Sequence, residues 1–374
     1  MPVGDTHPKP LVHEPTSGVH KHTLILLHGR GGSAATFGPA LLNTPLAPAA
    51  ARGTENTSAS ASSTPPPETN TSPHHGRKGR DCLPADQVPP PLPPRATTTT
   101  TLAQALPHAR FVFPTAPRGR ATVYRRSVVR QWFDDWHLGG AGSGDAVGGS
   151  YDAGLQTGGM GRAVAYLHDL VAREAGVVGG GARNVVLGGI SQGCAVSLVA
   201  SLLWEGDGLG GVVGMCGWLP YVLQMRGLLG GGEVDDDGDD EMGLVTASSF
   251  GGEEVGFDPF DRSASPGCDA VSPGGGSSDT GAPVTAALGW LRDEIEVPGG
   301  RTGSVVRGSG GTPAILCHGQ DDAKVDVSKG EEAAGFLPAL GIGPVRFETY
   351  AGVGHEFSAD MLLDIVEFVQ RVLE

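Results

Sequence analysis

The sequence of 374 residues contains no long hydrophobic run. A helix that crosses a bilayer needs about 18 or more consecutive apolar residues, and no segment approaches that length. The first 18 residues, MPVGDTHPKPLVHEPTSG, also lack the apolar core of a secretory signal. We therefore predict a protein of the cytoplasm with no stable membrane insertion.

The sequence also lacks paired cysteines. Its five cysteines are an odd number without paired spacing: Cys82, Cys194, Cys216, Cys268 and Cys317. Three of them lie in or beside predicted core elements, where a free thiol behaves as a small apolar group. This pattern favours a reducing compartment over a disulfide scaffold.

Positive charge is scarce, and the formal net charge is −15 at pH 7. Binding to nucleic acid requires clustered Lys and Arg, so we expect no nucleic-acid partner. The acidic runs at 235–237 and 239–241 lack the spacing of a calcium loop and are more typical of solvated sequence. The glycine-rich turn at 28–33 matches neither common phosphate-binding pattern. We expect no metal and no cofactor.

Two long segments have few periodic apolar residues, about 43–101 and 230–311. Such sequence cannot bury enough apolar surface to offset the entropy lost on ordering, so we predict two largely disordered insertions. A helical piece at 284–295 interrupts the second, and the proline run at 89–94 fits either a spacer or a ligand for a partner module. The expected organisation is a disordered tail over 1–20 and a single domain over 21–374 that carries both insertions.

The rest of the sequence alternates apolar runs with segments of helical periodicity. Strands are predicted at 22–27, 109–113, 185–187, 211–216, 313–317 and 345–350, and helices at 36–42, 155–174, 194–203, 328–340 and 361–369. Apolar strands that alternate with helices are typical of the α/β class, with a mostly parallel sheet covered by helices on both faces.

The central feature is the pattern G-x-S-x-G at 189–193, which lies between a predicted strand and a predicted helix. A serine on so tight a turn has a strained backbone, and glycines two residues to either side avoid collisions with the neighbouring elements. This context is typical of a nucleophile elbow with Ser191 at its tip. The alternative is a chance match in a chain with 61 glycines.

Potential partners for Ser191 follow two later strands. A serine nucleophile needs an imidazole to take its proton, and the imidazole needs a carboxylate to orient it. The carboxylate could be Asp321, Asp322 or Asp326, and the imidazole is that of His355. Ligand sites of parallel sheets lie beyond the carboxyl ends of the strands, and the order Ser, Asp, His is that of the α/β-hydrolase arrangement.

Other polar groups near these strand ends have separate expected roles. His318 lies directly at a strand end and is expected to be a structural hydrogen-bonding residue. An oxyanion site needs two N–H groups, which we expect from the backbone of Gln192 and from the turn at 29–31. The two tryptophans of the segment 131–136 are expected either to pack in the hydrophobic core or to form the wall of an apolar pocket.

The chain resembles the phospholipase/carboxylesterase family that includes the acyl-protein thioesterases. Seven ordered motifs support this: LILLHGRGGS (24–33), FVFPTAPRG (111–119), QWFDDW (131–136), GGISQGCAVSL (188–198), GWLP (217–220), LCHGQDDAKV (316–325) and GVGHEF (352–357). The resemblance implies an α/β-hydrolase fold with nucleophile Ser191, acid Asp322 and base His355, and with oxyanion donors at the backbones of Arg30 and Gln192. It further implies that substrate is bound near Trp132, Phe133, Trp218 and Leu219.

The activity implied by the resemblance is hydrolysis of acyl esters or thioesters through an acyl-enzyme. The substrate would be an acylated protein, with a lysophospholipid or short-chain ester as the alternative. A binding protein that retains the hydrolase fold is the non-enzyme alternative, and a serine peptidase is a third. One departure is Arg30, which stands where many relatives carry an apolar residue. The others are the linker after the first helix and the insertion after residue 220, both much longer than in a compact member; the second would act as a lid or partly block the site.

Overall fold

The computed structural model describes residues 7–46, 100–135, 146–230, 281–297 and 311–373. Most of the two predicted insertions, together with Cys82 and Cys268, lies outside the described residues. The predicted helical piece at 284–295 does lie within the described residues, where it forms α6 (Gly281–Glu294). The expectation that the insertions are disordered therefore stays a prediction.

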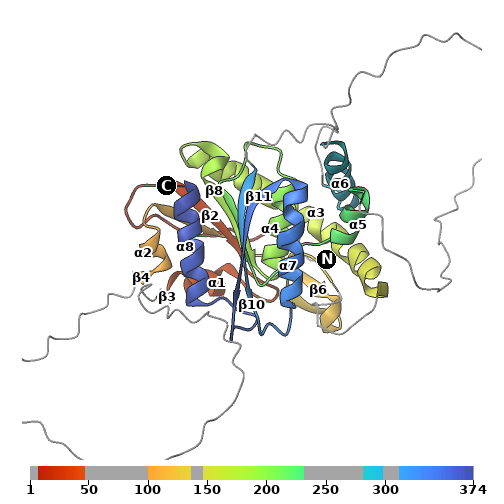
Figure 1. The fold of residues 1–374 in the computed structure, drawn as a ribbon. Helices are drawn as coiled ribbons and strands as arrows, with labels where there is room; N and C mark the ends of the chain where they lie inside the picture. Colours follow the sequence, from red (N-terminus) through yellow and green to blue (C-terminus); the bar gives the residue numbers. More distant parts are fainter. Residues whose placement is uncertain (1–6, 47–99, 136–145, 231–280, 298–310, 374) are drawn as a thin grey trace, which may run out of the picture.

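A seven-stranded sheet forms the centre of the molecule (Figure 1). Its order is β1-β5-β2-β8-β9-β10-β11, and every neighbouring pair is parallel except β1 with β5. The strands are β1 (Leu11–His13), β2 (His22–Leu27), β5 (Ala109–Phe113), β8 (Val185–Ile190), β9 (Gly211–Met215), β10 (Thr312–Gly319) and β11 (Ile342–Tyr350). The predicted mostly parallel sheet is thus confirmed.

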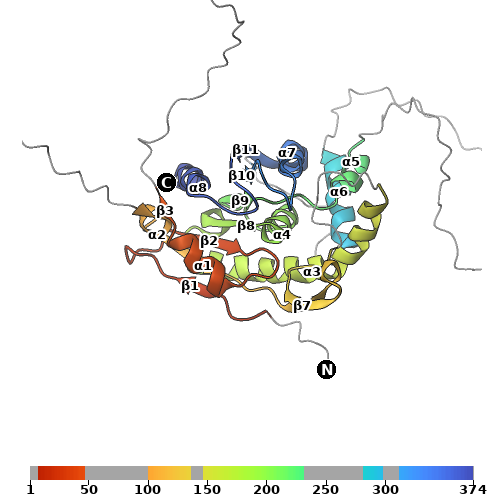
Figure 2. The same ribbon diagram turned by 90° about the horizontal axis from the view of Figure 1, so that it is seen from below.

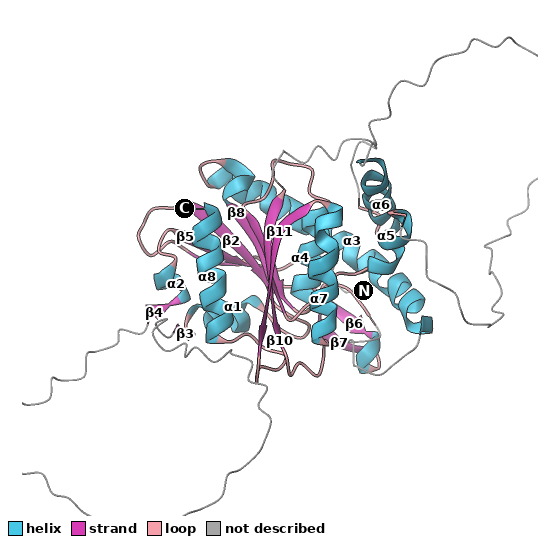
Figure 3. Ribbon diagram, viewed as in Figure 1, coloured by secondary structure: helices cyan, strands magenta, loops and turns pink. Residues whose placement is uncertain are grey.

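Helices cover both faces of the sheet, as Figures 2 and 3 show. Successive side chains of β2 alternate between two apolar clusters, with Ile25 and Leu27 in one and Leu24 and Leu26 in the other. This explains why the strand is buried along its whole length. The first cluster includes α3 (Ala146–Val177), α4 (Gln192–Leu202), α5 (Val222–Leu228), α6 and α7 (Val327–Phe336), and the second includes α1 (Ala34–Leu42), α2 (Leu102–Ala105) and α8 (Ala359–Leu373).

The structure corrects part of the predicted disordered tail over 1–20. Residues 11–13 form β1, which pairs antiparallel with β5 in the register Leu11↔Phe113. The strand is three residues long, too short to show an alternating pattern, and its backbone hydrogen bonds to the edge of the sheet hold it in place.

Smaller elements complete the described chain. Two short antiparallel pairs were not predicted: β3 (Pro45–Leu46) with β4 (Thr100–Thr101), and β6 (Arg118–Ala121) with β7 (Ser127–Arg130). Three 3₁₀ helices cover Thr122–Tyr124, Gly181–Asn184 and Leu337–Leu340. Within the ranges given above, no helix combines the length and hydropathy needed to cross a bilayer.

The three cysteines of the described core are free and buried, as predicted: Cys194, Cys216 and Cys317. Burial raises the pKa of the Cys216 thiol to about 11 and that of Cys317 to about 12. Burial also raises the pKa of Cys194. These thiols stay protonated at neutral pH and contribute to packing as small apolar groups.

Candidate active site

Ser191 lies on a sharp turn between β8 and α4. Its backbone angles are φ 58° and ψ −123°, a conformation that L-residues rarely adopt. A Cβ atom at Gly189 would lie 2.6 Å from the Leu27 carbonyl oxygen, and one at Gly193 would lie 2.5 Å from the same atom. The strained turn and the need for both glycines, predicted from the G-x-S-x-G spacing, are therefore confirmed.

The imidazole of His355 joins two side chains from distant parts of the sequence. Its Nε2 lies 2.9 Å from the Ser191 hydroxyl oxygen, and its Nδ1 lies 2.8 Å from Asp322 Oδ2. His355 follows β11 and Asp322 follows β10, so the carboxyl ends of the parallel strands bring the groups together. In this arrangement the serine hydroxyl donates to Nε2, and Nδ1–H donates to the carboxylate.

Of the three candidate acids, Asp322 is the one that faces the imidazole. It is buried, and its Oδ1 accepts the backbone N–H groups of Lys324 and Val325 at 2.9 Å each. Asp321 is exposed. The Asp326 carboxylate instead caps α7 by accepting the N–H of Ser328.

The surroundings of Asp322 keep it ionised. Burial alone would raise its pKa, but the neighbouring His318 imidazole, 3.4 Å away, and the hydrogen bonds from His355 and the two backbone N–H groups hold the pKa well below its usual range. His318 is itself buried and donates from Nε2 to the Val325 carbonyl oxygen at 3.0 Å. This agrees with the structural role predicted for His318.

The glycine-rich loop after β2 lies directly against Ser191. A Cβ atom at Gly29 would lie 3.2 Å from Ser191 Cβ, a contact tight enough that a larger residue would require the serine or the loop to shift. Between described residues, no hydrogen bond uses the backbone N–H of Arg30 or of Gln192. Gln192 follows Ser191 in the chain, and Arg30 follows Gly29, which packs against Ser191. An oxyanion role for these two N–H groups stays a prediction.

His28 anchors the base of this loop as a neutral imidazole. Its Nδ1–H donates to the Gly29 carbonyl oxygen at 2.7 Å, and its Nε2 accepts the N–H of Ala116 at 3.1 Å. Burial lowers the pKa of His28 to about 4. One proton on the ring satisfies both contacts, whereas a second proton on Nε2 would face another donor.

The segment 131–135 supports the loop and the elbow from behind. The Trp132 indole N–H donates to the His28 carbonyl oxygen at 2.7 Å. The Gln192 side chain donates to the Phe133 carbonyl oxygen at 2.9 Å and accepts the Trp132 backbone N–H at 3.3 Å. The Asp134 carboxylate accepts the N–H of Thr122 at 2.8 Å, which ties the segment to the end of β6.

The residues predicted to bind substrate lie partly inside the core. Trp132 and Phe133 are each 2 % exposed, and Leu219 is buried beside them in the same cluster. Trp218 is half-buried and meets the Phe133 ring edge-on at 6.1 Å between centroids. A substrate contact of these side chains stays a prediction.

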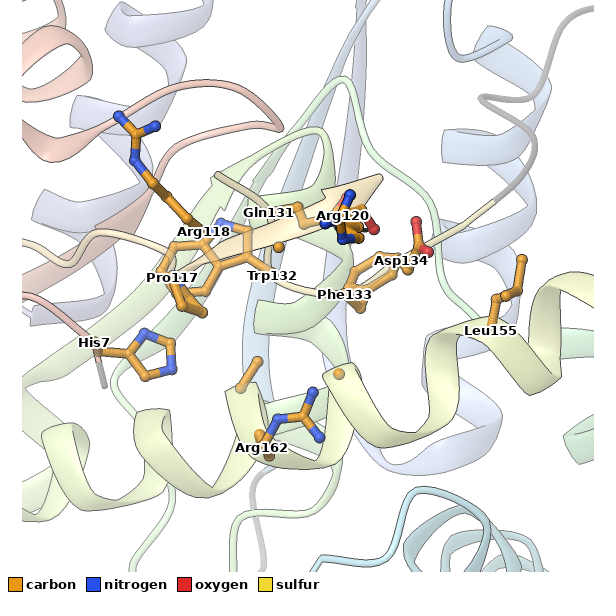
Figure 4. Close-up of a pocket in the computed structure, with 13 residues that line it drawn as sticks. His7, Pro117, Arg118, Arg120, Gln131, Trp132, Phe133, Asp134, Leu155 and Arg162 are labelled. Atoms are coloured by element: carbon orange, nitrogen blue, oxygen red, sulfur yellow. Dashed lines mark hydrogen bonds between the residues drawn. The ribbon is translucent and has the colours of Figure 1, made fainter. Parts of the chain in front are cut away.

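A separate cavity of about 210 Å³ lies on another side of Trp132 (Figure 4). His7 faces the Trp132 ring at 5.8 Å between centroids, and Arg118 of β6 and Arg162 of α3 are among the residues that line the cavity. Ser191, Asp322 and His355 do not line this cavity. In the part of the chain that the structure describes, no group of three or more His, Cys, Asp or Glu residues could hold a metal ion.

Comparison with known proteins now adds to this geometry. The model of the phospholipase/carboxylesterase family matches residues 95–227 and 281–373. The chain belongs to this family. Acyl-protein thioesterase 1 of Yarrowia lipolytica is 33 % identical over 129 residues, which is 33 % of this chain and 51 % of the relative. Acyl-protein thioesterase 1 of Gibberella zeae is 24 % identical over 272 residues, which is 72 % of this chain and 80 % of the relative.

Among solved structures, the family member resembles Arabidopsis thaliana SOBER1. The TM-score is 0.50 at 18 % identity, and the match covers 95 % of this chain and all of the other. A likeness at this identity concerns the fold, and it agrees with the parallel sheet and its covering helices. The predicted α/β-hydrolase fold is therefore confirmed. The match to the Yarrowia relative spans about half of that protein's length.

Proposed function

We propose that this protein hydrolyses acyl esters or thioesters through an acyl-enzyme formed on Ser191. The observation that carries the proposal is the position of His355, with one ring nitrogen 2.9 Å from the Ser191 hydroxyl and the other 2.8 Å from the Asp322 carboxylate. Serine hydrolases use these three groups in these contacts to activate the nucleophile.

In the proposed reaction, Ser191 Oγ attacks the acyl carbonyl carbon while its proton moves to His355 Nε2. The tetrahedral intermediate collapses, the carbon–oxygen or carbon–sulfur bond breaks, and the leaving group takes the proton from His355. Water then attacks the acyl-enzyme with the same base, which releases the carboxylic acid and restores Ser191. The ionised Asp322 holds the imidazole in the required tautomer and stabilises its positive charge.

The carbonyl oxygen becomes negative in the intermediate and needs donors at that moment. We assign this role to the backbone N–H groups of Arg30 and Gln192. Three observations support the assignment. Gln192 follows Ser191 in the chain, and Arg30 follows Gly29, which packs against Ser191. Neither N–H donates within the described residues, and Gln192 opens α4, where the helix dipole favours negative charge.

For the substrate we favour an acylated protein, because the relatives that match include proteins named acyl-protein thioesterase. Lysophospholipids and short-chain esters use the same chemistry and are the alternatives. We also propose that the chain from β1 onward, residues 11–374, forms one domain that acts in the cytoplasm, which extends the predicted 21–374 by the edge strand. The continuous sheet supports the single domain, and the free, buried cysteines suit a reducing compartment.

A fluorophosphonate probe tests the proposal directly, because it labels only an activated serine. The wild type should be labelled at Ser191, and Ser191→Ala should abolish both labelling and hydrolysis. Ser201→Ala is the matched control, since Ser201 lies at the other end of α4 and both serines are 6 % exposed. Its labelling should equal that of the wild type. An unlabelled wild type would leave a hydrolase-fold binding protein as the better description.

Substrate class is tested by comparing rates on a palmitoyl thioester peptide, a lysophospholipid and a short p-nitrophenyl ester. The proposal expects the highest kcat/KM on the palmitoyl thioester. A preference for either of the other substrates would reassign the class while leaving the Ser191 chemistry intact.

A further inference from the structure

Asp135 is a fully buried carboxylate that touches both residues assigned to the oxyanion site. It is 0 % exposed. One oxygen forms an ion pair with Nη2 of Arg30, and the other accepts the Gln192 side-chain N–H at 3.2 Å. Arg30 comes from the loop after β2, whereas Gln192 opens α4, so one carboxylate links two separate elements beside Ser191.

We propose that Asp135 is the positioning residue of the oxyanion site. This inference rests on the proposed function and specifies how its two donors are held. The donors themselves are backbone N–H groups, and Asp135 acts on them through the side chains of the same two residues. By fixing both side chains, it fixes the separation of the two N–H groups before the substrate arrives.

The loop that carries Arg30 is held on both sides of this residue, by the Gly31 N–H to the Arg130 carbonyl oxygen at 2.8 Å and by Trp132 at the His28 carbonyl oxygen, and Asp135 holds the Arg30 side chain between them. The loop contains Gly29, Gly31 and Gly32, and glycine gives the backbone more conformational freedom than any other residue. A mobile loop would have to be ordered at each turnover, which would reduce the benefit of preorganised donors. Arg30 Nε and Nη1 have no hydrogen-bond partner among the described residues, so the contact with Asp135 is the main polar restraint on this side chain.

The charges of the pair also fit the role. A lone carboxylate in contact with the side chain of Gln192, the residue after Ser191, would oppose the negative charge of the tetrahedral intermediate. The Arg30 guanidinium balances it, and the pair brings no net charge to the site. Buried ion pairs are weak sources of stability and can often be replaced by apolar residues without loss. The stability of the fold and the geometry of the site can therefore be separated by substitution.

The test compares the wild type and three variants for hydrolysis, for melting temperature and for affinity towards a trifluoromethyl ketone that forms a tetrahedral adduct on serine. Asp135→Asn should lower kcat about 10- to 100-fold with KM changed less than about threefold, since loss of a whole oxyanion donor costs about 100- to 1,000-fold. Affinity for the ketone should fall in the same proportion. The combined change Arg30→Leu with Asp135→Leu should have a melting temperature close to that of the wild type, because no buried charge is left unpaired. Its kcat should stay as low as that of Asp135→Asn, because the backbone N–H groups remain but the side chains that position them are no longer linked.

Glu174→Gln is the matched control. It breaks another ion pair of a buried carboxylate, in which Arg110 Nε lies 3.0 Å from Glu174 Oε2, at a different place on the sheet. It should lower the melting temperature and leave kcat within about twofold of the wild type, as expected for a purely structural pair.

The outcomes separate the two proposals. An active wild type with an Asp135→Asn variant that keeps its kcat, or loses kcat without losing affinity for the ketone, would overturn the positioning role alone. Recovery of kcat together with stability in the double variant would do the same. A wild type that neither hydrolyses substrate nor labels at Ser191 would overturn the proposed function and this inference with it.

Discussion

The two sides of Ser191 are built in different ways. On one side, His355 and Asp322 present side chains from the ends of β11 and β10, linked by single hydrogen bonds of 2.9 and 2.8 Å. On the other side, the proposed oxyanion donors are the backbone N–H groups of Arg30 and Gln192. Their side chains turn away from the serine into a buried network with Asp135.

His355 and His28, one on each side of Ser191, differ in exposure and in hydrogen-bond partners. The His355 side chain is 14 % exposed and lies against a carboxylate that is ionised across the physiological range, so it can accept a proton. His28 is 1 % exposed and is held between a carbonyl acceptor and an N–H donor. The same ring therefore serves as a proposed proton carrier on one side and as a fixed, neutral support on the other.

The largest expected effect is a loss of kcat when the contact between His355 and Asp322 is altered. Asp322→Asn should lower kcat about 10³- to 10⁴-fold with the fold intact, because the amide no longer holds the imidazole in the required tautomer. Asp321→Asn is the adjacent control and should stay within about threefold, as that side chain is exposed. Steady-state kinetics of both variants with the same ester substrate test which aspartate orients His355. A larger loss in the Asp321 variant would reject our choice of acid.

The second effect is on stability and concerns His28. Its pKa is about 4 in the folded state and about 6.5 when unfolded, so between these values the unfolded chain binds the additional proton. The neutral histidine thus contributes stability that is fully present above pH 6.5 and is lost as the pH falls towards 4. The loss amounts to about 3 kcal/mol.

Urea unfolding of the wild type and of His28→Gln at several pH values measures this contribution. The difference in unfolding free energy between the two proteins should shrink as the pH falls from 6.5 to 4. Other titrating groups affect both proteins alike and cancel in the difference. A difference that stays constant with pH would show that His28 is not held neutral by the fold.

The smallest expected effect comes from Trp132, whose indole supports the glycine-rich loop after β2. Trp132→Phe removes the indole N–H that binds the His28 carbonyl oxygen and leaves this buried acceptor unpaired, at a cost of about 1–2 kcal/mol. We expect a lower melting temperature and a kcat reduced about three- to tenfold, since the loop is less well held. Trp204→Phe is the control, because its indole donates to Asp207 in an exposed contact. It should change neither quantity appreciably.

The convergence of Ser191, an aspartate and His355 could be predicted from the sequence, because each of these residues follows an apolar strand. Short buried runs indicate parallel strands, and parallel strands bring their carboxyl ends to one edge. The choice among Asp321, Asp322 and Asp326 could not be made from spacing alone. It depends on which carboxylate turns inward to accept the N–H groups of Lys324 and Val325, and here the family resemblance pointed to Asp322.

The oxyanion side could be predicted only in part. The glycines of the loop and the residue after the serine were recognised from local patterns. Asp135 was missed, because its partners Arg30 and Gln192 lie 105 and 57 positions away and no local pattern encodes such contacts. The doubled aspartate in QWFDDW was the only signal in the sequence, and it does not say which carboxylate turns inward.

The pairing of β3 with β4 has a practical consequence for protein engineering. Pro45–Leu46 and Thr100–Thr101 pair with each other, so the described residues on either side of 47–99 meet at one point. The entropic cost of closing a loop rises only slowly with length, by about 0.6 kcal/mol for each doubling. We therefore expect this point to accept a grafted reporter domain with neighbouring termini in place of residues 47–99, with little change in the melting temperature of the hydrolase.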